Sequence, residues 1–209
     1  MDYLLYNLDT LSAPPEDTEL LDAHELEQYA SRGEKYLIAR ALLKKELSRR
    51  SSIPAHLIHF EYNVHGKPTW PQQHFNISHS AHWLCLAFHH APVGVDIQQI
   101  RPVRRLEELA PRIMCAQQLE RFREAGASLE EFFTCWSIAE ALVKLHGATI
   151  WEAGNYPYIY SHGRVSLLEE SETVRVNSLP LPLASVAPSR LGSKRTQPQG
   201  AYAQCGCIK

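Results

Sequence analysis

Two kinds of hydrophobic pattern divide this chain into predicted strands and predicted helices. Short apolar runs bounded by turn residues predict strands, and these runs cover 3–8, 57–62, 75–79, 83–88 and 93–97. Longer amphipathic or apolar segments predict helices, at about 19–30, 34–50, 104–124 and 129–145. Weaker strand patterns follow at 156–160 and 173–176.

The order of these elements indicates the fold class. Strands are bunched together and helices are bunched together, which favours an α+β fold over a doubly wound sheet. From about residue 188 the sequence becomes polar and rich in Ser, Gly, Gln and Lys. This composition predicts a disordered tail over 188–209.

Composition narrows the class of protein. With 209 residues of which 44% are hydrophobic, the chain can form one large domain or two small lobes around a core. A net charge of -2 argues against nucleic acid or an anionic membrane as a partner. The first residues carry no pattern of a signal peptide, and the five cysteines lack the spacing of a disulfide framework. We therefore expect a cytoplasmic protein.

The predicted strand at 93–97 carries the first candidate functional group. Alternate residues of a strand share a face, so Val95 points into a core while Gly94, Asp96 and Gln98 share the opposite face. This places a carboxylate beside a carboxamide, next to a glycine that lets a ligand approach closely. The alternative is a strand end with two solvated polar groups.

The predicted helix at 129–145 carries the second candidate functional group. Ser128 fits its N-cap, and Gly147 fits the position just past its end. Between residues 132 and 145 the only charged residues are Glu140 and Lys144, and apolar residues occupy every side, as in a buried helix. The alternative is an ordinary exposed i,i+4 salt bridge. Because a buried carboxylate is costly unless it is paired, protonated or metal-bound, Glu140 and Asp96 together indicate a site.

Three further features bear on a ligand. The run 75–80 offers Ser78 and His79 as donors for an anion, but neighbours in a strand face opposite ways and cannot act as a nucleophile–base pair. Gly66-Lys67-Pro68 forms a stiff turn around one lysine. Eight of the eleven histidines fall between 56 and 90, but their spacings match no zinc motif.

Taken in order, these segments resemble the 4′-phosphopantetheinyl transferases, in the branch with two similar lobes in one chain. The likeness spans roughly residues 32 to 147. The segments that carry it are Ala39-Arg40-Ala41-Leu42-Leu43, Gly66-Lys67-Pro68, 75–80, Gly94-Val95-Asp96-Ile97 and Trp136-Ser137 with Glu140-Ala141 and Lys144. The resemblance implies a monomer of two pseudo-symmetric α+β lobes, 1–97 and 98–187, each with a small antiparallel sheet and a packed helix.

The resemblance also implies a reaction. Such a protein transfers the 4′-phosphopantetheine arm of coenzyme A to a serine of an apo acyl or peptidyl carrier protein, with Mg²⁺, and releases adenosine 3′,5′-bisphosphate. An acidic carrier would suit the exposed arginines expected between residues 101 and 123.

Site residues follow by matching position. The metal ligands would be Asp96 and Glu140, with Gln98 offering a neutral oxygen, and Glu140 is the candidate catalytic base. The residues expected to bind coenzyme A are Arg40, Lys67, Pro68, Ser78, His79, Asp96 and Lys144. Two carboxylates plus substrate phosphates are a usual way to hold Mg²⁺.

The chain departs from the family pattern at three positions. Gln98, Gln118 and Ala139 stand where the family usually has an acid, a Glu and a Lys. These replacements leave a second interpretation open, a non-catalytic homologue that binds coenzyme A or a carrier protein. A histidine-based metallohydrolase is a third.

Overall fold

A three-stranded antiparallel sheet forms the N-terminal part of the protein in this computed structural model, which describes residues 2–161, 164–168, 173–174 and 203–208. Its strands, in the order in which they pair, are β1 (Asp2–Asn7), β5 (Trp83–His89) and β4 (His74–Ser80). The register places Leu86 opposite Leu4 on one side and Ile77 on the other. The expected strands at 3–8, 75–79 and 83–88 are confirmed to within one residue or two.

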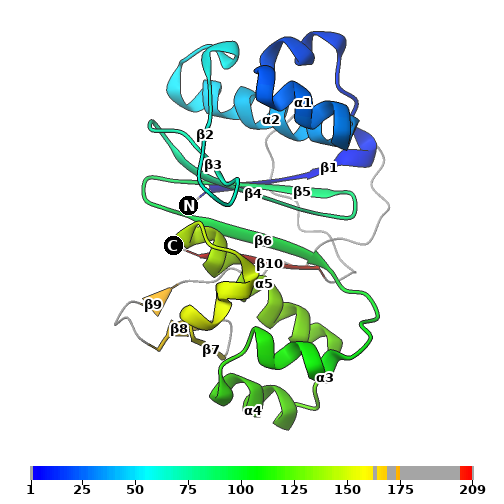
Figure 1. Cartoon of the computed structure of the whole chain (residues 1–209), viewed down its shortest axis with the longest axis vertical. Coiled ribbons are helices and arrows are strands. Elements are labelled where there is room, and N and C mark those ends of the chain that lie inside the picture. Colours follow the sequence, from blue (N-terminus) through cyan, green and yellow to red (C-terminus); the bar gives the residue numbers. More distant parts are fainter. Residues whose placement is uncertain (1, 162–163, 169–172, 175–202, 209) are drawn as a thin grey trace.

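Helices α1 (Ala23–Arg32) and α2 (Glu34–Ser51) cover one face of this sheet (Figure 1). The core between them includes Leu43 and Leu47 of α2 and Phe88 of β5. The expected helix at 19–30 begins later, because Asp22 forms a capping box with Glu25 and the preceding segment Pro15–Leu20 is a 3-10 helix.

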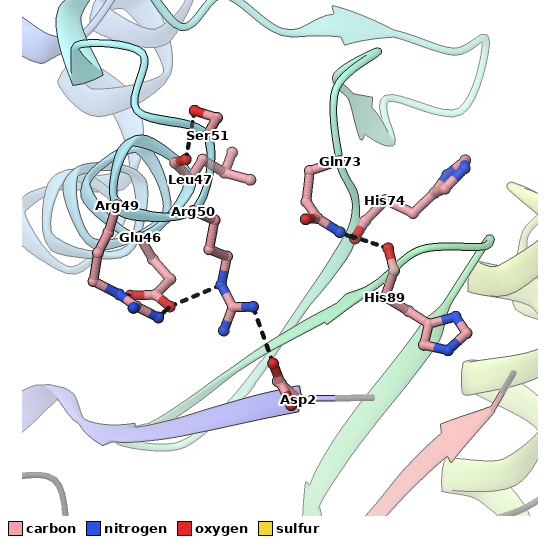
Figure 2. Close-up of polar contacts among 9 residues, drawn as sticks. All are labelled: Asp2, Glu46, Leu47, Arg49, Arg50, Ser51, Gln73, His74 and His89. Atoms are coloured by element: carbon pink, nitrogen blue, oxygen red, sulfur yellow. Dashed lines mark hydrogen bonds and ion pairs between the residues drawn. The ribbon is translucent and has the colours of Figure 1, made fainter.

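The end of α2 is fastened to the sheet by one arginine. Arg50 Nη1 donates to Asp2 Oδ2 of β1 at 3.1 Å, and Arg50 Nε donates to Glu46 Oε1 at 2.8 Å (Figure 2). Its guanidinium also lies 4.2 Å from the ring centroid of Phe88. These contacts fix the helix against both β1 and β5.

Strand β6 (Gly94–Gln99) lies against the opposite face of the sheet (Figure 1). Its Val95 and Ile97 pack with Cys85 and Ala87 in a small buried cluster. Along β6, the expected alternation is confirmed, because Val95 and Ile97 point into this core.

Strand β4 is joined to β6 by side chains rather than by a backbone ladder. Polar side chains at alternate positions of β4 accept hydrogen bonds from alternate backbone amides of β6. The pairs are Asn76 Oδ1 with Val95 N (2.9 Å), Ser78 Oγ with Ile97 N (3.2 Å) and Ser80 Oγ with Gln99 N (3.0 Å). These side chains satisfy amides that a neighbouring strand would otherwise pair.

The other edge of β6 pairs with β10 (Ala203–Ile208) in antiparallel register, with Asp96 opposite Gly206. The prediction of a disordered tail over 188–209 is therefore wrong for these six residues, while 188–202 and 209 lie outside the described residues. Residues 203–208 form a strand because the open edge of β6 offers unpaired amides and carbonyls, which are a template for another strand.

Helix α5 (Leu129–His146) packs on the second face of β6 and β10 and forms the centre of the C-terminal part (Figure 1). Ser128 caps its start, and Gly147 ends it in a left-handed conformation at φ 70°, as the sequence predicts. The other elements of the C-terminal part are, in chain order, α3 (Leu106–Leu109), η4 (Ala110–Arg112), α4 (Ala116–Glu124), η5 (Ile150–Asn155), β7 (Tyr158–Ser161), β8 (Arg164–Leu167) and β9 (Thr173–Val174).

Two expected elements are shorter than predicted. The helix at 104–124 is broken into α3, η4 and α4, since Pro111 lacks the amide that a continuous helix needs. The strand at 57–62 is reduced to β2 (Glu61–Tyr62), because Ala55–Leu57 turns into a 3-10 helix after Pro54. Strand β2 pairs with β3 (Pro68–Thr69) to form a small hairpin.

These elements confirm an α+β fold of helices and small antiparallel sheets. The boundary predicted between residues 97 and 98 falls inside β6, which contacts both halves. Among the described residues, no helix has both the length and the apolar character needed to cross a lipid bilayer.

Candidate active site

Asp96 lies at the centre of a polar cluster between β6 and α5. Its side chain is 1% exposed, and both carboxylate oxygens have partners. Lys144 Nζ lies 2.6 Å from Oδ1, Ser78 Oγ donates to Oδ1 at 2.7 Å, and Gln98 Nε2 donates to Oδ2 at 3.0 Å. We call these four residues, Asp96, Ser78, Gln98 and Lys144, the Asp96 cluster.

Ser78 uses its whole hydrogen-bonding capacity within this cluster. A hydroxyl has one proton to donate and two lone pairs to accept with. The proton goes to Asp96, and the lone pairs accept from Ile97 N at 3.2 Å and from Lys144 Nζ at 3.0 Å. In this arrangement Ser78 holds Asp96 and Lys144 in place and has no further bond to offer a ligand.

Gly94 allows a close approach, but by the protein itself. A Cβ at this position would lie 2.0 Å from the backbone oxygen of Ala141 and 2.9 Å from Leu145 N. The expectation that Gly94 makes room for a ligand is therefore wrong, because the space is filled by the backbone of α5. The missing side chain is what lets α5 sit directly on β6 and brings its polar residues to Asp96.

Glu140 lies one helical turn before Lys144 on α5 and is partly buried. Burial raises the pKa of its carboxyl above the usual range, the Lys144 ammonium opposes this rise, and the charge of Asp96 adds to it. The two carboxylates thus repel each other across the β6–α5 junction. A carboxyl of raised pKa is a better proton acceptor near neutral pH than an ordinary one.

Asp96 and Glu140 form a pair rather than a larger acidic group. No three His, Cys, Asp or Glu side chains come together as possible metal ligands within the described parts of the chain. Gln98 extends the pair only through its neutral amide, whose nitrogen donates to Asp96. Two carboxylates whose charges repel suit a divalent cation that also binds substrate phosphates, so the donor set fits Mg²⁺.

Lys67 and Pro68 line a cavity of about 240 Å³ beside the β2–β3 hairpin. Trp70, Phe75 and Pro92 give this cavity apolar walls. Gln73 also lines it, and Gln73 Nε2 donates to the backbone oxygen of His89 at 2.5 Å (Figure 2). Glu61 lines the cavity as well as Lys67, so its apolar walls suit a flat heterocycle with polar groups at its edge.

The ammonium of Lys67 has protein partners of its own. Lys67 Nζ donates to the backbone oxygens of Lys144 and Leu145 at the end of α5. Burial lowers the pKa of this ammonium. The structure therefore links the cavity wall to the helix that carries Glu140.

His79 and Arg40, both predicted to bind coenzyme A, lie outside the Asp96 cluster. Loss of solvent around its ring lowers the pKa of His79, and the nearby charges of Lys144 and Arg32 lower it further. Arg32, at the end of α1, is a basic residue that the sequence analysis missed. No local pattern marks Arg32 as a neighbour of His79, because the two residues come from α1 and β4.

Arg40 is buried on α2, on the other side of the sheet. Its Nε donates to Tyr36 Oη at 3.1 Å and lies 3.8 Å from Glu25 Oε1. Among the described residues, Arg40 Nη1 is a buried donor without a hydrogen-bond partner. A buried guanidinium with a spare donor is suited to bind an anion.

Gln118 and Ala139, two of the departures from the family pattern, belong to the C-terminal core. Gln118 is fully buried; its Oε1 accepts from Tyr160 N at 2.8 Å and its Nε2 lies 3.5 Å from Cys135 Sγ. Ala139 is buried on α5 among apolar residues. Gln118 therefore makes its hydrogen bonds outside the Asp96 cluster.

Comparison with known proteins identifies the class to which this fold and this cluster belong. A sequence model of the 4′-phosphopantetheinyl transferase superfamily matches residues 92–156, the segment that carries both Asp96 and Glu140. The 4′-phosphopantetheinyl transferase AcpT of Escherichia coli K12 is 32% identical over 158 residues, covering 71% of this chain and 74% of the relative. The chain belongs to the 4′-phosphopantetheinyl transferase superfamily.

Two Bacillus relatives match a shorter segment. The 4′-phosphopantetheinyl transferase psf-1 of Bacillus pumilus is 34% identical over 119 residues, which are 54% of this chain and 50% of the relative. The 4′-phosphopantetheinyl transferase Sfp of Bacillus subtilis is 29% identical over 116 residues, 53% of this chain and 51% of the relative. In these two comparisons the matched segment spans about half the length of each relative.

Proposed function

We propose that this protein transfers the 4′-phosphopantetheine arm of coenzyme A to a serine of an apo carrier protein, in an Mg²⁺-dependent reaction. The observation that carries the proposal is the packing of α5 on β6, which places Lys144 Nζ 2.6 Å from the buried Asp96 carboxylate and Glu140 one helical turn before Lys144. Burial raises the pKa of Glu140, and the charge of Asp96 adds to this rise. Membership of the superfamily also supports this function, because the matched segment contains both residues.

In the proposed reaction, the serine oxygen forms a bond to the phosphorus that carries the pantetheine arm. The bond from this phosphorus to the bridging oxygen of the pyrophosphate breaks, and adenosine 3′,5′-bisphosphate leaves. Glu140, or a water that it orients, accepts the serine proton, and its raised pKa favours this role.

Asp96 and Glu140 would hold Mg²⁺, with the carbonyl oxygen of Gln98 as a neutral ligand. Bound Mg²⁺ supplies the positive charge that neutralises the pyrophosphate. Lys144 would leave Asp96 to contact a phosphate. Arg40, His79 and Lys67 would bind the other phosphates of coenzyme A, while Pro68 would line the pocket for its heterocycle.

The partner would be an acidic carrier protein. The arginines between residues 101 and 123 are all exposed, around α3 and α4; they are Arg101, Arg104, Arg105, Arg112, Arg121 and Arg123. Basic side chains spread over one segment favour docking of an acidic surface. We further propose two pseudo-symmetric lobes, 1–97 and 98–187, in a cytoplasmic monomer, since one chain carries both acids of the site.

A second candidate function is supported by one observation. Asp96 accepts from Lys144, Ser78 and Gln98, so the protein itself supplies three donors to this carboxylate. A carboxylate held by protein donors suits a non-catalytic homologue that binds coenzyme A or a carrier protein.

Mass spectrometry of an apo acyl carrier protein distinguishes the two functions. The carrier is incubated with this protein, coenzyme A and Mg²⁺, with EDTA in a parallel sample. We expect an EDTA-sensitive mass gain equal to the phosphopantetheine arm, absent for Asp96→Asn and retained for Asp9→Asn, an exposed aspartate paired with Lys35. Binding of coenzyme A without any mass gain across several carriers would support the non-catalytic function instead.

A further inference from the structure

The turn between β2 and β3 lies against the C-terminal end of α5, far away along the chain. Asn63 Nδ2 donates to the backbone oxygen of Gly147 at 2.8 Å, across 84 positions of sequence. Lys67, at the other end of the same turn, donates to the backbone oxygens of Lys144 and Leu145. The oxygens of Lys144 and Leu145 lie in the last turn of α5, where carbonyls lack partners within the helix, and the Gly147 oxygen follows directly after it.

Asn63 has a double role that its amide alone can fill. Its Oδ1 accepts from His65 N at 3.0 Å and from Lys67 N at 2.8 Å, which shapes the turn. Because both neighbours are amide donors, Oδ1 must face them and Nδ2 must face Gly147. An aspartate would keep the turn but would place a second acceptor against the Gly147 oxygen.

This contact fixes the helix that carries the candidate catalytic groups. Glu140 and Lys144 lie in the last two turns of α5, and Gly147 follows directly after the helix. Earlier in α5, the backbone of Ala141 meets Gly94 of β6. Packing in the C-terminal core holds the body of α5. The Asn63 contact adds a hold on the end of the helix, next to Lys144 and two turns from Glu140.

We propose that Asn63 is a positioning residue for the reaction, which orients α5 so that Glu140 and Lys144 face Asp96. Asn63 acts through the Gly147 carbonyl and touches neither substrate nor metal. The proposal rests on the proposed transferase function. It predicts that loss of the Asn63–Gly147 bond slows the chemical step more than it weakens coenzyme A binding, because a small misplacement of catalytic groups is costly.

Steady-state kinetics of Asn63→Asp test this, with Asn7→Asp as the matched control. Asn7 also shapes a turn through its Oδ1, which accepts from Asp9 N, so the control keeps that role. We expect kcat for Asn63→Asp to fall roughly tenfold while KM for coenzyme A changes less than about twofold, and Asn7→Asp to match the wild type. An unchanged kcat for Asn63→Asp, or an equal loss in both variants, overturns the proposal.

Hydrogen exchange of the end of α5 gives a readout that does not depend on activity. Gly147 N and Ala148 N bond back to Lys144 O and Val143 O, so their exchange reports on this helix end. We expect faster exchange of both amides in Asn63→Asp than in Asn7→Asp. If the wild type transfers nothing, the transferase function fails, and unchanged exchange would still separately refute the positioning role.

A double-mutant cycle with Gly147→Ala tests the same contact through sterics. A Cβ at Gly147 would lie 2.7 Å from Asn63 Nδ2, in addition to the strain of a side chain at φ +70°. We expect Gly147→Ala to lower Tm more in the wild type than in Asn63→Ala, where the clash is gone. Additive effects of the two substitutions on Tm would show that the residues do not contact each other and would overturn the proposal.

Discussion

Lys144 and Asp96 are 48 positions apart in the chain, yet Lys144 Nζ lies 2.6 Å from Asp96 Oδ1. Asp96 comes from a strand and Lys144 from a helix, and the absence of a side chain at Gly94 lets the two elements meet. In this arrangement the ammonium contacts the carboxylate that would hold Mg²⁺ in the proposed function. Lys144 is thus the cation that compensates Asp96 when no metal is bound.

Substitution of Lys144 by methionine removes that compensation. A buried carboxylate without its cationic partner is strongly unfavourable, so we expect Lys144→Met to lower the free energy of unfolding by about 3 kcal/mol. Lys35→Met removes an exposed lysine paired with the exposed Asp9, so its effect on the free energy of unfolding should be much smaller. Urea denaturation of both variants measures the difference.

Mg²⁺ should stabilise the Lys144→Met variant more than it stabilises the wild type. Without the competing ammonium, Asp96 is open to a divalent cation, so we expect Mg²⁺ to raise Tm more in Lys144→Met than in the wild type. Equal shifts in Tm would mean that Lys144 and Mg²⁺ do not compete for Asp96.

Gln98→Glu restores the acid that the family usually has. A carboxylate at this position would replace the Gln98 Nε2 donor and face Asp96 Oδ2 directly. We expect a lower Tm in EDTA from this repulsion, a larger gain in Tm on adding Mg²⁺, and a transfer activity that is retained but more Mg²⁺-dependent. The exposed neighbour Gln99→Glu is the control, and complete loss of transfer in Gln98→Glu would contradict the placement of residue 98 beside the metal.

Local patterns predicted the elements of the site but not their contacts. The alternation in β6 and the two ends of α5 follow from residue types at fixed spacing, which is why Val95, Ser128 and Gly147 behave as expected. The partner of Gly94 depends on which element packs against β6, and sequence spacing within β6 says nothing about that. The same holds for Ser78, whose three partners come from β6 and α5.

The sequence contains a sign of the helix break at Pro111, but it contains no sign of the environment of Gln118. Pro111 sits inside the segment 104–124, and its missing amide marks the break that separates α3 from α4. Gln118 resembles a replaced catalytic acid when only the order of motifs is considered. Its burial against Tyr160 and Cys135 becomes apparent only in the folded chain.

Gly94→Ala tests the close packing of α5 on β6. The added Cβ would lie 2.0 Å from a backbone oxygen, and backbone atoms of two regular elements cannot move aside cheaply. We expect the free energy of unfolding to fall by at least about 3 kcal/mol, measured by urea denaturation. Gly154→Ala, whose Cβ would meet nothing within 4 Å, should be nearly neutral; similar losses in both would refute the close approach.

The substitution Gln118→Glu restores the acid that the family usually has and tests its effect on stability and transfer. An ionised carboxylate would be buried in the C-terminal core, where it has no cationic partner among the hydrogen bonds of Gln118. We expect a loss of several kcal/mol in the free energy of unfolding and no gain in transfer. The control is Gln117→Glu, an exposed neighbour on the same helix; a Gln118→Glu protein that is as stable and more active would return residue 118 to the active site.

Cys135 should make stability depend on alkaline pH. Burial raises the pKa of its thiol from 9.0 to about 12, so the folded protein keeps a proton that the unfolded chain releases. The contribution of the protonated Cys135 thiol to the free energy of unfolding is fully present below pH 9 and is lost as the pH rises toward about 12. Between these values the unfolded state binds fewer protons, and stability falls by up to about 1.4 kcal/mol per pH unit.

Urea denaturation at several pH values between about 8 and 10.5 measures this effect. The wild type and Cys135→Ala share all their other titrating groups, so the difference between their free energies of unfolding isolates the thiol. We expect the stability advantage of the wild type over Cys135→Ala to shrink as pH rises above 9.0. Cys115→Ala, at a partly exposed cysteine, is the control for loss of a thiol. A difference between wild type and Cys135→Ala that stays constant across this range would show that the Cys135 thiol titrates alike in the folded and unfolded protein.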